Sequence, residues 1–320
     1  MSLVRNSAYE QKLAALESLR SAGDAGPETP RALRKALGDR NNYVVSKAAA
    51  IAATLGLNQL IPDLLAAYNR FFTDPTKTDP QCWAKNALSK ALADLGHDDS
   101  ATYLRGLRHI QMEPVWGGQA DSAATLRGNC ALALVSCRDL SDLDLLTYLT
   151  DVLVDPDKTV RAEAARAIGR LGSREAAIVL RLRALVGDAE PEVLGSCLSA
   201  LLSIDPGHGI PFVASFLDRG GDPAAEAALA LGLTHDARAF ELLKDRLARE
   251  RHPDVRTALV TAIALTRLPE ALEMLVRLVE TSAPDAATAV EALTSARLPD
   301  ELRARLNAAI QNMRRQPPYP

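Results

Sequence analysis

The sequence predicts an all-α protein built from many similar stacked helices. Alanine and leucine together supply about a third of the 320 residues, whereas aromatic residues make up only 4%. The strands of a β-sandwich or barrel need more β-branched and aromatic side chains than this. Hydrophobic residues reach 48%, which is too many for a disordered chain. A pattern with helical spacing also recurs along the chain, and its small side chains would let neighbouring helices approach closely.

The clearest copy of this pattern covers residues 157–172, with the sequence DKTVRAEAARAIGRLG. Its leading aspartate, Asp157, can cap a helix, and Gly172 can end the helix in the left-handed conformation. Between these two signals, the apolar residues recur at the spacing that places them on one helix face, namely Val160, Ala164, Ala167, Ile168 and Leu171.

The chain contains eight copies of this pattern, most of them partial. They lie near residues 42–56, 83–96, 126–137, 157–172, 191–204, 222–232, 253–263 and 284–293. Other amphipathic segments precede several copies, at residues 61–72, 143–154, 174–186, 237–249 and 268–280. The repeating unit is therefore a hairpin of an A helix and a patterned B helix. Because one hairpin cannot bury its own apolar face, the hairpins are expected to stack into an α-solenoid.

Residues 157–172 resemble the short HEAT repeat of the phycobilisome-lyase-like HEAT family, whose pattern is D-x-x-V-R-x-x-A-A-x-A-L-G-x-L-G. The resemblance extends over about residues 30–313 and implies a single α-solenoid of about eight HEAT-like hairpins within residues 1–313. It also implies that the B helices line a concave groove. Repeats of this kind serve many binding roles, so the resemblance predicts the fold more specifically than the function.

Three segments depart from the regular repeat. Residues 73–81 (TDPTKTDPQ) and 111–121 (QMEPVWGGQAD) are longer than the usual connection within a helix pair. We expect them to form loops that project from one edge of the solenoid. Residues 314–320 (RRQPPYP) are expected to form an extended tail, because proline cannot continue a helix.

The sequence contains no arrangement of residues that is typical of catalysis. Phosphate-binding loops and nucleophile elbows are absent. The five histidines do not have the spacing of a metal site, and the aspartates that follow His97 and His235 are expected to cap the next helices. Three of the four cysteines fall at core-facing positions of B helices, where they act as small apolar residues. We therefore expect no enzymatic activity, no cofactor and no metal.

Basic residues recur at two positions of the B helices. The position after the first core residue holds Lys85, Arg127, Arg161 and Arg256. In the family that the chain resembles, this arginine often bonds an aspartate of the adjacent repeat, and Asp157 and Asp254 lie near Arg161 and Arg256. A structural role for these two arginines is therefore the favoured interpretation, and partner binding the alternative.

Five residues further along the B helices, Lys90 and Arg166 are predicted to point away from the core into the groove, with Arg170 close by. They are the stronger candidates for contact with an acidic partner. The complete set of basic candidates for partner binding is Lys85, Lys90, Arg127, Arg161, Arg166 and Arg170.

The two tryptophans lie at or beside the long connections. Trp83 begins a B helix and is expected to pack against its neighbours. Trp116 is followed by two glycines and preceded by Met112. It is either an exposed anchor for a partner or part of a loop folded back over an apolar edge, and the sequence leaves both open. Met112 and Trp116 complete the candidate binding residues.

The function predicted from these features is that of a non-catalytic scaffold or adaptor. It would hold a partner protein or peptide, with an acidic or mixed-charge surface, in the concave groove. One alternative is a nucleic-acid-binding protein similar to HEAT-like DNA glycosylases, but a net charge of −3 disfavours it. Another, implied by the resemblance alone, is a bilin-lyase-type subunit. The N-terminus lacks the features of a secretory signal and no apolar stretch is long enough to span a membrane, so a cytoplasmic location is expected.

Overall fold

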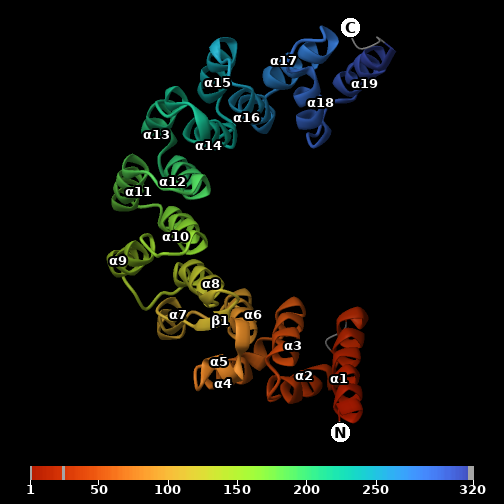
Figure 1. Cartoon of the computed structure of the whole chain (residues 1–320), viewed down its shortest axis with the longest axis vertical. Coiled ribbons are helices and arrows are strands. Elements are labelled where there is room, and N and C mark those ends of the chain that lie inside the picture. Colours follow the sequence, from red (N-terminus) through yellow and green to blue (C-terminus); the bar gives the residue numbers. More distant parts are fainter. Residues whose placement is uncertain (1, 24–25, 316–320) are drawn as a thin grey trace. The chain divides into compact units, whose positions relative to one another are not determined.

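The structure is a computed structural model that describes residues 2–23 and 26–315. Two compact units divide the chain, an N-terminal unit of residues 1–167 and a C-terminal unit of residues 168–320. Helix α10 (Lys158–Leu171) spans the boundary between them (Figure 1). The last helix, α19, ends at Arg315, so the first two residues of the predicted tail are helical. Residues 316–320 of that tail lie outside the described residues.

The N-terminal unit begins with α1 (Ser2–Ala22), which the repeat pattern did not predict. Three A helices follow, and each precedes a B helix. The A helices are α2 (Glu28–Leu37), α4 (Ile61–Arg70) and α7 (Ser100–Leu107), and the B helices are α3 (Asn42–Thr54), α6 (Trp83–Asp94) and α8 (Ala124–Leu134). A short 3₁₀ helix, η1 (Asn58–Leu60), precedes α4, and α9 (Asp142–Val152) leads into α10.

The C-terminal unit continues the same alternation. Its A helices are α11 (Arg174–Val186), α13 (Pro206–Ala214), α15 (Ala237–Arg249) and α17 (Pro269–Glu280). Its B helices are α12 (Pro191–Ile204), α14 (Gly221–Gly232), α16 (Pro253–Leu265) and α18 (Ala286–Thr294), and α19 (Asp300–Arg315) follows them. The 3₁₀ helix η3 (Leu217–Arg219) precedes α14. With α9 and α10 as the fourth pair, the described residues contain the eight hairpins that the sequence predicts, and the fold is an α-solenoid.

Alanine-rich contacts between successive B helices form the core of each unit. In the N-terminal unit α6 packs between α3 and α8, and in the C-terminal unit α12, α14, α16 and α18 pack in series. Four alanines of the B helices are completely buried, namely Ala48, Ala164, Ala165 and Ala228. At Gly232 two B helices approach closely, because an added Cβ atom would lie 2.9 Å from the Cα atom of Ala262 and closer still to its carbonyl oxygen.

Side chains at the helix ends explain where many helices begin. Oxygen atoms of the capping residues accept hydrogen bonds from backbone N–H groups of the first turn, which have no partner within the helix. The caps that the sequence predicts after the two histidines are present, at Asp99 before α7 and Asp236 before α15. The predicted cap of α10 is also present, since Asp157 accepts from Thr159 and Val160, and Gly172 beyond it has a φ of +68°.

The two long connections are more structured than the predicted loops. Residues 73–81 include a short helix, α5 (Pro75–Thr78), and the start of a 3₁₀ turn, η2 (Pro80–Cys82). Residues 111–121 form a β-hairpin of β1 (Met112–Val115) and β2 (Gly118–Asp121), paired antiparallel with Val115 opposite Gly118. The two-residue turn between the strands is Trp116-Gly117, and the φ of +88° at Gly117 suits glycine at the second turn position. An expectation based on helix periodicity missed both elements because each is only a few residues long.

Candidate functional site

Lys85 and Arg127 were predicted to contact a partner, and their burial excludes this role. Lys85 is 0% exposed, and its ammonium group donates hydrogen bonds to Asp79 Oδ2 at 2.9 Å and to the carbonyl oxygen of Phe71 at 3.2 Å. Asp79 is equally buried and also accepts from the backbone N–H groups of Ala84 and Lys85. A buried charge needs such partners, because water is not available to solvate it. Lys85 therefore fixes the start of α6.

Arg127 has the same kind of structural role between two repeats. Its guanidinium group binds Asp121 at 2.5 Å and Asp155, which lies in the next repeat, at 2.8 Å and 3.0 Å. Arg256 repeats the arrangement with Asp285 of the next repeat, at 3.0 Å. This confirms the structural interpretation of Arg256, although its partner is Asp285 and not the nearer Asp254.

The remaining basic candidates lie at or near the surface. Arg161 donates to the backbone carbonyl oxygens of Asp155 and Pro156, so it also supports the start of α10. Arg166 is exposed and bonds Glu163 within its own helix at 2.6 Å. Lys90 is exposed and lies 3.2 Å from Asp94, and Arg170 is exposed. Of the six basic candidates, Lys90, Arg166 and Arg170 thus have side chains that a partner can reach.

An open groove on the B helices of the N-terminal unit brings Lys90 together with two aromatic residues. We call it the α3–α6 groove; it has a volume of about 500 Å³. Two cations and two aromatic rings face it, and none of its lining side chains is a carboxylate. The lining residues are Tyr43, Ser46, Lys47, Ala50, Trp83, Asn86, Ala87, Lys90, Thr125 and Asn129.

The aromatic pair of the groove comes from two different repeats. The rings of Tyr43 and Trp83 meet edge to face, with centroids 5.5 Å apart. Trp83 therefore packs against a neighbour as expected, although 45% of its surface remains exposed. The ammonium group of Lys47 lies 5.0 Å from the centroid of the Tyr43 ring. Within the described part of the chain Lys47 forms no ion pair, so its charge is available to a ligand.

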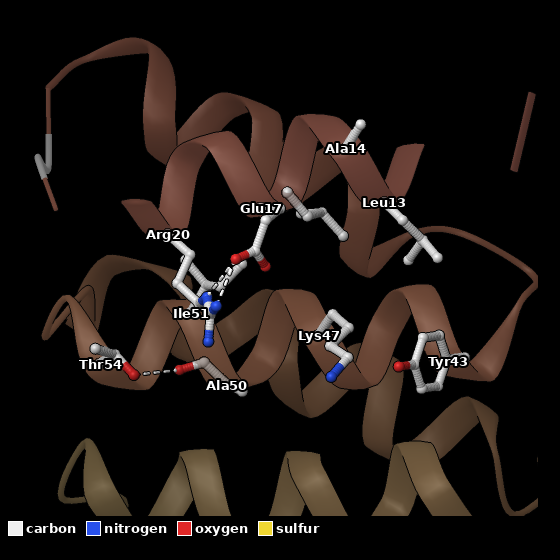
Figure 2. A pocket seen from close by; sticks show the side chains of 10 residues that line it. Leu13, Ala14, Glu17, Arg20, Tyr43, Lys47, Ala50, Ile51 and Thr54 are labelled. Atoms are coloured by element: carbon white, nitrogen blue, oxygen red, sulfur yellow. Dashed lines mark hydrogen bonds and ion pairs between the residues drawn. The ribbon is translucent and has the colours of Figure 1, made fainter. Parts of the chain in front are cut away.

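A second groove adjoins the first across α3. It lies between α1 and α3, has a volume of about 510 Å³, and shares Tyr43, Lys47 and Ala50 with the α3–α6 groove. Figure 2 shows the side chains of α1 facing those of α3, with Arg20 paired to Glu17 of its own helix. The two grooves form one surface whose centre is Tyr43 and Lys47.

Hydrogen bonds at one end of the β-hairpin hold it in place, and Trp116 lies at its other end. Glu113 of β1 accepts hydrogen bonds from the backbone N–H of Gln81 at 2.8 Å and from the Ser122 hydroxyl at 2.9 Å. Burial would raise the pKa of Glu113, but these bonds and one from Gln111 outweigh it and hold the pKa below its usual value. At the other end, Trp116 is fully exposed. Met112, the other predicted anchor for a partner, is less exposed, at 45%. The hairpin therefore does not fold back over an apolar edge.

Tyr43, Lys47, Asn86 and Asn129 line the groove but were not among the predicted residues. A sequence signal for the aromatic pair existed, because Tyr43 and Trp83 each directly precede the first core residue of their B helices, Val44 and Ala84. Following that position from repeat to repeat would have found the pair. Their contact itself depends on how α3 and α6 pack.

The histidines, cysteines and carboxylates of the described residues do not cluster in a way that could hold a metal ion, and the cysteines are buried. Among residues 2–23 and 26–315, no group of three or more His, Cys, Asp and Glu side chains is placed to hold a metal ion. All four cysteines are buried and free, and burial raises the pKa of the Cys82, Cys130 and Cys197 thiols to about 12. A raised pKa favours the protonated thiol, which is less reactive than the thiolate. In the same ranges, no helix has the length and apolar character needed to cross a membrane.

Comparison with solved structures finds matches of low sequence identity. The complex of CpcE and CpcF of phycocyanin lyase from Nostoc sp. PCC7120 is 22% identical, with a TM-score of 0.38, and the match covers 71% of this chain and 88% of that one. Human deoxyhypusine hydroxylase is 19% identical, with a TM-score of 0.31 and coverage of 79% and 89%. An engineered protein is 18% identical, with a TM-score of 0.34 and coverage of 96% and 91%.

No curated protein matches the chain. The family model of HEAT repeats matches residues 146–224, from α9 to the first turn of α14. This segment contains the clearest copy of the sequence pattern, and the same alternation of A and B helices continues on both sides of it. Residues 146–224 therefore match HEAT repeats, and the α-solenoid fold continues on both sides of them.

Proposed function

We propose that the protein is a binding scaffold that holds an acidic segment of a partner protein in the α3–α6 groove. The observation that supports this proposal is the pair of half-buried Tyr43 and exposed Trp83, which lines a groove together with Lys47 and Lys90 and without a carboxylate. Aromatic residues give large contact area with little loss of side-chain entropy, and they are common at the centres of protein interfaces. The two ammonium groups favour a partner segment with carboxylates next to an apolar side chain.

The hairpin adds a second contact in this proposal. Trp116 is fully exposed, and Val115 beside it is 50% exposed. The hydrogen bonds of Glu113 to Gln81 and Ser122 hold the hairpin to the residues that precede α6 and α8, so a partner meets a pre-ordered element. A partner that occupies the groove and also covers Trp116 buries more contact area. It loses little free energy to ordering the hairpin, because the hairpin is already held in place.

Site-specific photocrosslinking from within the groove tests the proposal. A photoreactive amino acid at Ala87, in the groove, is expected to crosslink a defined protein in cells of the native source. The same amino acid at Glu241, which is exposed on α15, is the matched control and is expected to give no such product. Mass spectrometry of the crosslinked peptide then identifies whether the captured segment is acidic.

Charge reversal in the groove separates binding from non-specific capture. Lys47→Glu with Lys90→Glu is expected to abolish the crosslink at Ala87, whereas Arg249→Glu on α15 leaves it unchanged. Circular dichroism checks that the variants remain folded. The proposal is wrong if the crosslink survives the double reversal, or if nucleic acid and not protein is recovered at Ala87.

A further inference from the structure

A stripe of exposed apolar side chains runs along α11 in the C-terminal unit. Ile178, Leu182, Leu185 and Val186 are 67%, 62%, 51% and 74% exposed. Their spacing places them on one side of the helix, while the opposite side of α11 is buried in its contact with α12. Single exposed aliphatic residues are common, but four adjacent ones on one helix indicate a surface for another molecule.

A groove continues this stripe toward the neighbouring helices. It lies between α11, α12 and α13 and has a volume of about 510 Å³. Ala177 and Ile178 of α11 line one side of it, and Leu201 and Ile204 of α12 lie opposite. The stripe and the groove share Ile178, so they form one continuous apolar surface.

Two arginines border this surface. Arg174 and Arg181 both line the groove, and neither bonds a carboxylate among the residues that the structure describes. The guanidinium carbon of Arg181 lies 3.8 Å from the centroid of the Phe212 ring, so stacking on α13 holds its charge at the groove. The groove also contains one carboxylate, Asp205, which lies 2.8 Å from the Nδ1 atom of His208. The two arginines outnumber this carboxylate, so the lining of the groove has an excess of positive charge.

We propose that this surface, the α11 face (Arg174, Ala177, Ile178, Arg181, Leu182, Leu185 and Val186), binds an acidic amphipathic helix of another protein. From Ile178 to Leu185 the stripe extends about 10 Å, or two helical turns, which suits a helix that contributes apolar residues at i, i+3 or i+4, and i+7. Carboxylates along one edge of that helix meet Arg174 and Arg181. This site is in the C-terminal unit and is separate from the α3–α6 groove.

The positive charge of Arg174 and Arg181 favours an acidic helix over a second copy of the chain as the occupant of the α11 face. In an antiparallel pair of α11 helices related by a two-fold axis, the edge with Arg174 and Arg181 faces the same edge of the other copy. Like charges then oppose one another across the contact, which disfavours it. A foreign helix with glutamates at its edge avoids this repulsion and pairs both arginines.

Fluorescence anisotropy with a synthetic peptide and the full-length chain tests the inference. The probe is a labelled helical peptide of about 18 residues with a leucine stripe and glutamates along both edges. It is expected to bind with a micromolar Kd. Ile178→Asp, which places a charge in the stripe, is expected to weaken binding at least about tenfold. The variant Lys47→Glu with Lys90→Glu is expected to bind the peptide as the wild type does, because those residues belong to the other site.

Reversing the charges on both partners gives the matched control. A peptide with lysines in place of the glutamates is expected to bind the wild type weakly and to bind the Arg174→Glu, Arg181→Glu double variant well. Circular dichroism confirms that this variant is folded despite the lost stacking on Phe212. The inference is overturned if the two peptides bind the wild type equally well. It is also overturned if only the Lys47→Glu, Lys90→Glu variant loses binding. Self-association of the chain that Ile178→Asp abolishes overturns it as well, because a second copy would then be the occupant.

Discussion

The buried ammonium group of Lys85 connects several parts of the N-terminal unit. Its partner Asp79 also accepts a hydrogen bond from the side chain of Asn42 on α3 at 2.9 Å, and the Asp79 carbonyl oxygen accepts from Gln111 at 2.8 Å. Two successive B helices and the residue before the hairpin therefore meet at Asp79, the first two at its carboxylate and Gln111 at its carbonyl oxygen. Removal of one charge from such a pair leaves the other buried without compensation.

Lys85→Met is therefore expected to destabilise the protein by about 3–5 kcal/mol, because Asp79 loses its cation while it stays completely buried. Chemical denaturation followed by circular dichroism measures the change. Lys90→Met is the matched control on the same helix: its pair with Asp94 is exposed, so a change below about 0.5 kcal/mol is expected. Equal losses in the two variants would show that the Lys85 pair has no special structural role.

Glu226 on α14 differs from the paired Lys85, because the folded structure disfavours its ionised form. Burial raises its pKa, and the nearby charges of Asp222 and Glu192 raise it further. A group whose pKa is higher in the folded state stabilises the fold when it is protonated, and that stability is lost as the pH rises through its folded pKa. At neutral pH the ionised Glu226 therefore lowers the stability of the C-terminal unit.

Glu226→Gln is expected to raise the unfolding midpoint at pH 7, since the amide has no charge to desolvate. The difference from the wild type should disappear below about pH 4, where the wild-type carboxyl is protonated in both states. Denaturation of both proteins across this pH range is the measurement. Glu291→Gln, at an exposed position on α18, is the control and should change stability by less than about 0.5 kcal/mol. A lower midpoint for Glu226→Gln at pH 7 would contradict the argument.

At the scale of the elements, glycines decide how closely successive helices approach. Gly232 of α14 faces the backbone of Ala262 on α16, which cannot rotate away as a side chain can. Gly128 of α8 faces Glu163, where an added Cβ atom would lie 3.1 Å from the flexible Cγ atom. Replacement of Gly232 would therefore displace backbone atoms, whereas replacement of Gly128 would displace only a side chain.

Gly232→Ala is expected to destabilise the C-terminal unit by about 1–3 kcal/mol, because α14 and α16 must move apart. Gly128→Ala is expected to be neutral or to stabilise by up to about 1 kcal/mol, because alanine favours the helix and Glu163 can adjust. Thermal unfolding of both variants measures the difference. If Gly232→Ala is as stable as the wild type, then the close approach of these two helices is not required.

A second periodic signal in the sequence precedes the B helices. A carboxylate stands five residues before the first core residue of six B helices, at Asp39, Asp79, Asp121, Asp155, Asp188 and Glu250. Except at Asp79, each accepts a hydrogen bond from the backbone N–H two residues later, which is the geometry of a turn before a helix. Where the preceding repeat supplies an arginine, as Arg127 does for Asp155, the turn also joins two repeats.

At the scale of the whole molecule, each repeat contacts mainly its neighbours, so stability is distributed along the chain. The B-helix contacts in each unit follow this rule, since α6 packs on α3 and α8, and α14 on α12 and α16. A local defect is therefore expected to loosen the adjacent repeats first, in contrast to a globular domain that unfolds as one unit.

Hydrogen exchange of Lys85→Met tests this expectation. Faster exchange is expected in α3, α6 and α8, whereas α14, α16 and α18 should exchange as in the wild type. Gly232→Ala is expected to give the reverse pattern, with faster exchange in α12, α14 and α16. Acceleration along the entire chain in either variant would show that the two units unfold together.

The sequence by itself determined the fold class, the eight hairpins and three of the helix caps, at Asp99, Asp157 and Asp236. These features follow from helical spacing and from side chains that bond their own backbone, both of which are local. Tertiary structure decided which charges are available to a partner. Lys85 and Lys90 lie on one helix five residues apart, yet one is completely buried and the other is exposed.

The contact between the two aromatic residues of the groove also could not be predicted from the sequence. Tyr43 and Trp83 are forty residues apart in the sequence, and only the packing of α3 on α6 brings their rings to 5.5 Å. Composition and periodicity describe one helix at a time, so they locate the apolar face of each repeat. Burial, ion pairing and the lining of a groove depend on which helices become neighbours, and for these features the stacked structure was necessary.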